Sequence, residues 1–324
     1  MSCKTKTCDC EAIECRLDAL ESNQKELAQR TEELRDAIDE LSPYVIAFVA
    51  DAGLAGDNQD AMMDLINSWA PNALVLGGDN NYPDGDSADA DDNLLAFKDY
   101  IEEVRCYPVV GNHDEGTDVI PSSSNYLYDK FPDLFSPTRP PRYSIKVPEK
   151  DAELFFLYSG MYSDGSLSPY GSNAVGAEIA RVTTEINESE YSQRLVFMHH
   201  TFCGPDIAGK THRYLSNLDF IPWVQIGVKT IFSGHTHTAF HLKGTGGYVE
   251  NLNLVDCSAT AEDLNAFTHP ISLIGGDTSD FEQTWLYDEE TRYVVKILIY
   301  KTYYRVEFWT FAGDIHHGFN VQLS

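Results

Sequence analysis

Seven residues with metal-binding side chains follow short apolar runs of the sequence. They are Asp51, Asp79, Tyr82, Asn112, His199, His235 and His237. Their carboxylate, phenol, amide and imidazole groups are donors that proteins offer to metal ions. Two ions can share such a set if one carboxylate bridges them, and two ions about 3.5 to 4 Å apart can clamp the attacking and leaving oxygens of a phosphoryl transfer. The set therefore indicates a dinuclear metal site suited to phosphoryl chemistry.

The spacing within the set refines this prediction. Tyr82 follows Asp79 by three residues, so both side chains can address the same metal ion from one loop. A phenolate is a hard, anionic donor that suits a trivalent ion such as Fe(III). His235 and His237 form an H-x-H pair, and each imidazole can reach a different ion.

The apolar runs that precede these residues predict buried strands. The expected strands are residues 44–50, 73–76, 107–110, 194–198 and 229–232, with helices at 58–69 and 91–104. Strands that alternate with helices predict an α/β fold with parallel strands. Open α/β sheets place their ligands at the carboxyl ends of the strands, where the polar residues stand.

Further strands are expected towards the C-terminus, at residues 294–300 and 304–311 with a turn between them. They supply enough β structure for a second sheet. We find no linker or low-complexity break between residues 43 and 324, so this stretch is expected to form one domain.

Five motifs in fixed order give the sequence a resemblance to a known family. They are Asp51-Ala52-Gly53, Gly78-Asp79-Asn80-Asn81-Tyr82, Gly111-Asn112-His113-Asp114, Val196-Phe197-Met198-His199 and Gly234-His235-Thr236-His237. Together they resemble the calcineurin-like metallophosphoesterase superfamily, and its purple acid phosphatase branch in particular, over roughly residues 44–240. The resemblance implies an α/β fold with a two-sheet β-sandwich flanked by helices. It also implies a phosphoric ester hydrolase that cleaves phosphate monoesters or diesters with a metal-bound hydroxide.

The resemblance also implies a role for each ligand. Asp51, Tyr82 and His237 would bind the first metal, Asp79 would bridge, and Asn112, His199 and His235 would bind the second. The wider superfamily commonly has D-x-H at the first motif, and Gly53 stands here in place of that histidine. Tyr82 would supply the missing ligand, which favours Fe(III) with a divalent ion (Fe, Zn or Mn).

The resemblance implies three further residues at the substrate. His113 would lie beside the phosphate as an acid for the leaving group or as a hydrogen-bond donor, with Asp114 as its orienting partner. His212 stands where related enzymes often carry a second histidine on the substrate side. His200 could line the same pocket.

Residues 1–42 follow a different pattern and are expected to form a separate region. Apolar residues recur at spacings of three and four, at Ile13, Leu17, Leu20, Leu27, Leu34, Ile38 and Leu41. A period of 3.5 residues predicts a coiled coil that self-associates, with a homotrimer slightly favoured over a dimer. The alternative is one amphipathic helix packed on its own domain. Four cysteines, Cys3, Cys8, Cys10 and Cys15, precede or enter this helix as free thiols or interchain disulfides, with a zinc site as the third interpretation.

The composition excludes several classes of protein. Acidic residues outnumber basic ones by 51 to 23, for a net charge of −28, which repels nucleic-acid phosphate. The chain has no run apolar enough for a membrane span and no signal-peptide pattern. We therefore expect a cytoplasmic protein of the producing cell, or a virion-associated or extracellular one. The alternative function is a displayed structural or receptor-binding module of an oligomeric viral or phage fibre, with or without residual phosphoesterase activity.

Overall fold

The computed structural model describes most of the chain. The described residues are 10–83, 85, 87–114, 126–135, 142–159, 180–201, 203–205, 211–213, 221–237, 239–246, 249–257, 281–286 and 292–323. The chain divides into two compact units, Met1–Pro43 and Tyr44–Ser324. Among the described helices, none has the length and apolar character of a membrane span.

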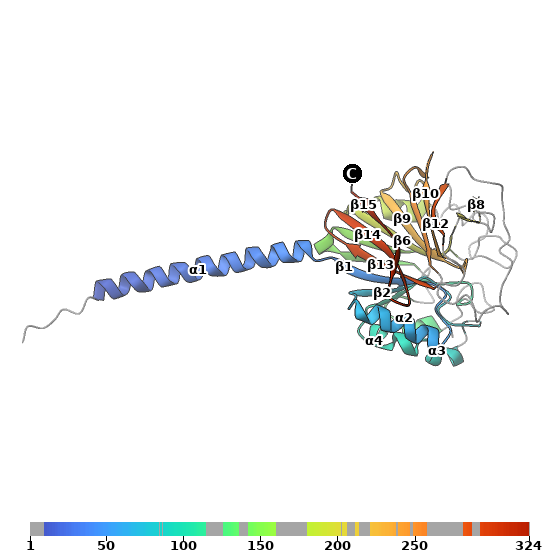
Figure 1. Cartoon of the computed structure of the whole chain (residues 1–324), viewed down its shortest axis with the longest axis horizontal. Coiled ribbons are helices and arrows are strands. Elements are labelled where there is room, and N and C mark those ends of the chain that lie inside the picture. The colour runs from blue at the N-terminus through green and yellow to red at the C-terminus, as the bar shows by residue number, and fades with distance from the viewer. Residues whose placement is uncertain are drawn as a thin grey trace, which may run out of the picture. The chain divides into compact units, whose positions relative to one another are not determined.

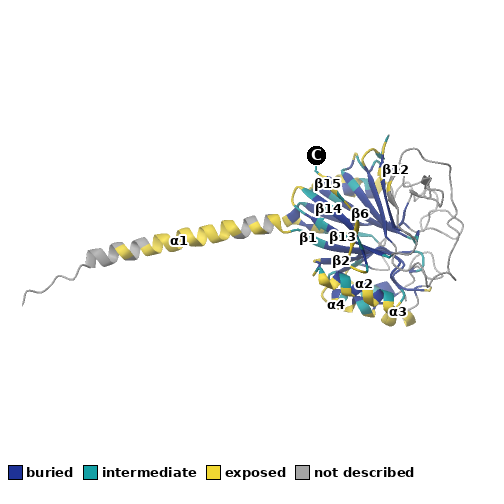
Figure 2. Cartoon of the chain, viewed as in Figure 1, coloured by how far each residue is buried: buried dark blue, intermediate teal, exposed yellow. Residues whose placement is uncertain are grey.

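The first unit contains one long helix, α1, over Cys10–Leu41. Leu20, Leu27, Leu34 and Leu41 recur every seven residues and are 64 to 75% exposed. The described part of α1 is drawn in yellow, the colour of exposed residues, in Figure 2. The predicted helix is confirmed, and it ends just before Pro43, as expected from the restriction that proline places on the residue before it. That α1 pairs with another copy stays a prediction. Cys3 and Cys8 lie outside the described residues.

The second unit contains two mixed sheets (Figure 1). The strands of the first sheet are β1 Tyr44–Val49, β2 Ala73–Leu76, β3 Cys106–Pro108, β13 Tyr293–Ile299, β14 Tyr303–Thr310 and β15 Ile315–Gln322. They are ordered β15-β14-β13-β1-β2-β3. β1, β2 and β3 run parallel, whereas β13, β14 and β15 add an antiparallel extension beside β1.

The second sheet has seven strands in the part of the chain that the structure describes. They are β4 Tyr143–Val147, β5 Ala152–Phe156, β6 Gln193–His200, β9 Val228–Gly234, β10 Ala239–Gly244, β11 Asn253–Cys257 and β12 Phe281–Leu286. Their order is β12-β10-β11-β9-β6-β5-β4, and β5, β6, β9 and β11 run parallel. A separate hairpin pairs β7 Cys203–Pro205 with β8 Thr211–Arg213.

Side chains alternate along the strands and sort the core into layers. In β1, Ile46 and Phe48 pack between the sheets with residues such as Phe197 of β6. Ala47 and Val49 point the other way and pack under α2, Asp57–Ser68. The outer face of the second sheet is covered by a helix at 180–187 and by the segment around Trp223. The result is a helix, sheet, sheet, helix sandwich, which confirms the expected fold class.

The helix expected at 91–104 is broken into three pieces. These are α3 Ser87–Asn93, a 3-10 turn η1 at Leu95–Phe97, and α4 Lys98–Glu102. The break follows from tertiary hydrogen bonds at Asn93. Its carbonyl accepts a bond from the amide of Gln59, and its side-chain amide donates to Asn81 and to the carbonyl of Tyr82. Those bonds attach the end of α3 to the loop after β2.

Two further short helical elements of this unit are α5 Tyr126–Lys130 and η2 Pro148–Lys150.

Candidate metal centre

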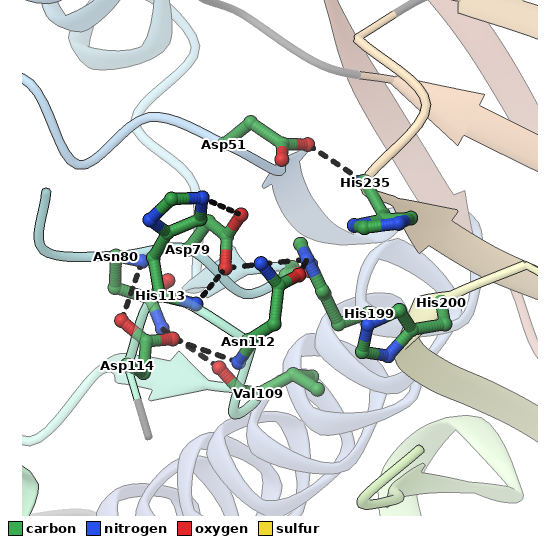
Figure 3. A network of polar contacts seen from close by, with 12 residues as sticks. Asp51, Asp79, Asn80, Val109, Asn112, His113, Asp114, His199, His200 and His235 are labelled. Atoms are coloured by element: carbon green, nitrogen blue, oxygen red, sulfur yellow. Dashed lines mark hydrogen bonds and ion pairs between the residues drawn. The ribbon is translucent and has the colours of Figure 1, made fainter. Parts of the chain in front are cut away.

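The candidate centre lies where the carboxyl ends of five parallel strands meet, as expected for an α/β sheet. Asp51 follows β1, Asp79 and Tyr82 follow β2, and Asn112 follows β3, all from the first sheet. The second sheet contributes His199 from the end of β6, and His235 and His237 from the loop after β9. Figure 3 shows five of these side chains, Asp51, Asp79, Asn112, His199 and His235, converging from the two sheets.

One group of donors gathers around Asp51. Its carboxylate lies 3.5 Å from Nε2 of His237, and Asp51, Asp79 and His237 each offer a ligand atom within 4.8 Å of the others. The Tyr82 hydroxyl donates to Asp79 Oδ2 at 3.1 Å and contacts Asp51 Oδ1 at 3.4 Å. The first predicted metal set is therefore close together.

A second group gathers around His199. Its Nδ1 donates to the carbonyl of Gly77 at 2.9 Å, which directs Nε2 towards Asn112 Oδ1 at 3.1 Å and Asp79 Oδ1 at 3.3 Å. The His235 ring centroid lies 5.2 Å from that of His199. Asp79 thus contacts both groups, as a bridging ligand must.

The backbone at this site adopts an uncommon conformation. Asp51, Asp79, His235 and His237 have φ values of 54°, 53°, 70° and 51°. Non-glycine residues in this left-handed region cost roughly 1 kcal/mol or more each, and such residues cluster at functional sites. Four of the predicted ligands share the feature, so the loops hold these side chains in a geometry that an unconstrained chain would avoid.

Gly53 is fixed by packing. A Cβ at this position would lie 2.2 Å from the carbonyl carbon of Asn80 and 2.3 Å from the backbone nitrogen of Asn81. Its backbone N–H donates to the carbonyl of Asp79 at 3.1 Å, and its carbonyl accepts from Tyr82 at 3.0 Å. The loop after β1 lies flat against the loop after β2, with no space for a histidine at residue 53. The tyrosine is positioned by this same contact.

Burial and neighbouring charges shift the pKa values of the buried groups at the site. Burial raises the pKa of Asp79, but His199, His113 and His235 outweigh it, and the net pKa lies below its usual range. Burial lowers the pKa of His199, whereas the Asp79 carboxylate raises it to about 10. Burial and the neighbouring His199 lower the pKa of His235 to about 3. Burial and the two carboxylates raise the pKa of Tyr82 well above its usual value, so a phenolate here requires a neighbouring cation.

These donors fit two metal ions by their chemistry. Asp51 and Asp79 are 0 and 1% exposed, and buried carboxylates are stable only when paired or coordinated. The first group offers carboxylate, phenol and imidazole, and the second offers imidazole, amide and the shared carboxylate. Imidazole suits zinc and iron, whereas carboxylate oxygens suit hard cations.

The three residues expected beside the substrate are placed differently. The His113 Nε2 lies 4.0 Å from Asp79 Oδ2, and its ring packs at 4.6 Å from that of Tyr82. Asp114 is 0% exposed and accepts bonds from Asn80, Gly111 and Tyr126, so it anchors the loop after β2 to the loop after β3. That it orients the His113 imidazole stays a prediction. His212 lies in β8 opposite Gly204, and its side chain is outside the described part of the chain.

One buried residue at the site was not predicted from the sequence. Asp256 is the penultimate residue of β11 and accepts hydrogen bonds from Ser233 at 2.8 Å and Thr236 at 2.7 Å. Thr236 stands between His235 and His237, so Asp256 fixes the loop that carries both imidazoles. The sequence signal is weak, because only Leu254 and Val255 form the apolar run before Asp256, whereas seven apolar residues precede Asp51.

Comparison with known proteins agrees with this fold. Three solved structures share the fold over 87% of this chain. GAP50, the anchor in the inner membrane complex of Plasmodium, is 12% identical with a TM-score of 0.58, over 90% of that chain. Purple acid phosphatase PPD1 from yellow lupin (Lupinus luteus) seeds is 13% identical with a TM-score of 0.55, over 54% of that chain. PhoD is 9% identical with a TM-score of 0.53, over 70% of that chain.

No curated protein sequence matches the chain. At the identities above, the structural similarity shows the fold alone. The sequence profile of the calcineurin-like phosphoesterases, however, matches residues 44–239, which is more than half of the 324 residues. The chain belongs to the calcineurin-like phosphoesterase family.

Proposed function

We propose that this protein is a dinuclear phosphoesterase that hydrolyses phosphate monoesters or diesters. One observation carries the proposal: two groups of buried and partly buried donors share the Asp79 carboxylate between them. When bound, the two ions would polarise a phosphoryl oxygen and supply hydroxide near neutral pH. Asp51, Tyr82 and His237 would hold the first ion, and Asn112, His199 and His235 the second.

His113 is the residue proposed to act on the leaving group. Its backbone N–H donates to Asp79 Oδ1 at 2.8 Å, and this hydrogen bond holds the backbone of His113 beside the proposed bridging carboxylate. The imidazole is 12% exposed, so it can meet a substrate that enters from solvent. It would protonate the departing oxygen or donate a hydrogen bond to the phosphoryl group. His212 is proposed to contact the substrate from the β7–β8 hairpin.

Tyr82 favours Fe(III) as the first ion, with a divalent Fe, Zn or Mn ion as the second. Tyr82 is 2% exposed and its hydroxyl contacts two carboxylates, so the hydroxyl loses its proton only if a strongly charged cation takes the proton's place. A hard phenolate then matches a trivalent ion better than a divalent one.

Metal analysis combined with one substitution tests the proposal. Purified protein should hold two metal ions per chain, and Asp79→Asn should abolish nitrophenyl-phosphate hydrolysis and release metal, because the amide is neutral and keeps only one of the two oxygens that face the two donor groups. Asp91→Asn is the control, since Asp91 is an exposed carboxylate that pairs with Lys130. Unchanged hydrolysis in Asp79→Asn, or a chain without metal, would contradict the mechanism.

We also propose that α1 mediates self-association. The seam of Leu20, Leu27, Leu34, Ile38 and Leu41 is 60 to 75% exposed, and burying each such side chain stabilises a complex by about 1.5 to 3 kcal/mol. The seam is interrupted by Thr31, whose hydroxyl donates to the carbonyl of Leu27. Mass measurements with and without residues 1–42 test this: the full chain should form a trimer or dimer, and a monomeric full-length chain refutes the proposal.

The alternative, a displayed structural or receptor-binding module of a viral or phage fibre, remains a hypothesis. The donor set favours the enzyme over it. A module with only a structural role gains nothing from two buried carboxylates and four left-handed residues, which lower stability unless an ion compensates.

A further inference from the structure

His200 is a buried histidine to which the seven-ligand set gives no role. It is 1% exposed, and its backbone N–H and its Nδ1 both contact the hydroxyl of Ser159, at 2.9 and 3.0 Å. Its other ring nitrogen, Nε2, is buried and has no hydrogen-bond partner among the described residues. Leaving a buried polar atom unsatisfied costs about 1 to 3 kcal/mol, so this nitrogen is expected to meet a ligand.

The strand that carries His200 explains how it reaches the centre. In a regular strand, His199 and His200 would point to opposite faces of the sheet. The pairing of β6 with β9 shifts register between Phe197 and His200, and such irregularities re-aim side chains next to functional sites. The ring of His200 accordingly lies 4.8 Å from that of His199 and 4.5 Å from that of His235. Figure 3 labels the three histidines together.

The three imidazoles form a compact set of nitrogen donors. His199, His200 and His235 each offer a ligand atom within 4.8 Å of the others. Nitrogens that share one zinc ion at 2.0 to 2.1 Å lie about 3.3 Å apart. The three ligand nitrogens would therefore have to approach one another by about 1.5 Å at most to bind one ion. The bond from Nδ1 to Ser159 fixes the ring, as hydrogen bonds to the far nitrogen of metal-binding histidines commonly do.

We propose that His200 is a further ligand of the second metal ion, beside His199, His235, Asn112 and Asp79. This inference rests on the proposed dinuclear site, and it adds a third imidazole to one of the two ions. The second site would then be rich in nitrogen, whereas the first has oxygen donors and one imidazole. Nitrogen donors select zinc or Fe(II) over manganese, so the second site should prefer those ions.

The test replaces His200 in the full-length chain and measures metal binding directly. His200→Asn keeps a polar atom near the position of Nδ1 for Ser159 but has none at Nε2, and His200→Phe keeps the ring shape without either nitrogen. His241→Asn is the matched control. His241 lies in β10, is 4% exposed, and forms hydrogen bonds with Asn253 and His317. Zinc and manganese affinities are measured by competition with a chelating dye, metal content by elemental analysis, and folding by thermal unfolding.

We expect both His200 variants to lose the second zinc ion or to bind it at least 10- to 100-fold more weakly. Substitution of residues that only hydrogen-bond to metal ligands already weakens metal binding by this range. Manganese affinity should fall less, and His241→Asn should bind two zinc ions as the wild type does. A folded His200 variant with unchanged zinc binding overturns the inference. This holds even if the variant hydrolyses substrate more slowly, because His200 would then contact the phosphate instead of the metal. A wild-type chain that binds no metal overturns the proposed function itself, so the two failures are distinct.

Discussion

Replacing Gly53 with alanine should disrupt the centre although residue 53 ligates nothing. The added Cβ would lie 2.2 Å from the carbonyl carbon of Asn80 and 2.5 Å from its oxygen. Carbon atoms in contact are ordinarily about 3.5 to 4.0 Å apart, so the two loops must separate by about 1 Å or more. Asp79 and Tyr82 stand on the loop that has to move, and both are proposed ligands of the first metal ion.

The magnitude follows from that displacement. Overpacking typically lowers the free energy of unfolding by about 1 to 3 kcal/mol. A misplacement of about 1 Å in catalytic groups lowers activity about 100-fold. Gly53→Ala should therefore unfold at a lower temperature, bind fewer than two metal ions and lose about 100-fold in kcat/KM. Gly53→His, which restores the D-x-H motif of the wider superfamily, should behave worse rather than regain a ligand.

The assay combines thermal unfolding, elemental analysis and nitrophenyl-phosphate hydrolysis. Gly246→Ala is the control, since a Cβ there has nothing within 4 Å, and it should match the wild type in all three. The reasoning is refuted if Gly53→Ala keeps two metal ions and wild-type activity, because the loops would then separate without moving the ligands.

Three more predictions concern single side chains. Tyr82→Phe should remove the visible absorption band of an iron-loaded protein, and a band of unchanged intensity would rule out Tyr82 as the iron ligand. Thr236→Val leaves the buried Asp256 without one donor, so it should lower the free energy of unfolding by about 1 to 3 kcal/mol and weaken metal binding. Ser233→Ala should lower the free energy of unfolding without weakening metal binding. Equal metal affinities in the two variants would contradict this prediction. Burial lowers the pKa of His241 to about 4, so the unfolded chain binds the proton first as the pH falls. The free energy of unfolding should therefore drop by up to about 3 kcal/mol between pH 6.5 and 4, and His241→Gln, measured by denaturant unfolding, should show a flatter profile.

The strands that carry the ligands could be predicted because their signal is local. A continuous apolar run followed by polar residues marks the end of a buried strand, and β1, β2, β6 and β9 all follow this rule. The expected strands at 294–300 and 304–311 are each displaced by one residue in β13 and β14. Cys106 and Cys257 are buried free cysteines.

Features that depend on distant contacts could not be predicted from the sequence. The sequence pattern predicts a helix that continues past Asn93. The helix ends there because Asn93 bonds to Gln59, 34 residues before it, and to the carbonyl of Tyr82 in the preceding loop. His200 reaches the centre because of a register shift between β6 and β9, which no residue pattern announces. The role of Gly53 likewise became clear only from its contact with the backbone of Asn80.

The two sheets supply different atoms to the centre, and this division affects the stability of the fold. The first sheet contributes the oxygen donors Asp51, Asp79, Tyr82 and Asn112, and the second contributes only imidazoles. Each ion would therefore join the two halves of the sandwich, and its binding energy would become folding energy. At a free metal concentration 100 times the dissociation constant, one ion adds about 2.7 kcal/mol. Chelation should accordingly increase hydrogen exchange at the carboxyl ends of β1 and β6 together, while β14 and β15 at the sheet edge remain as protected as before.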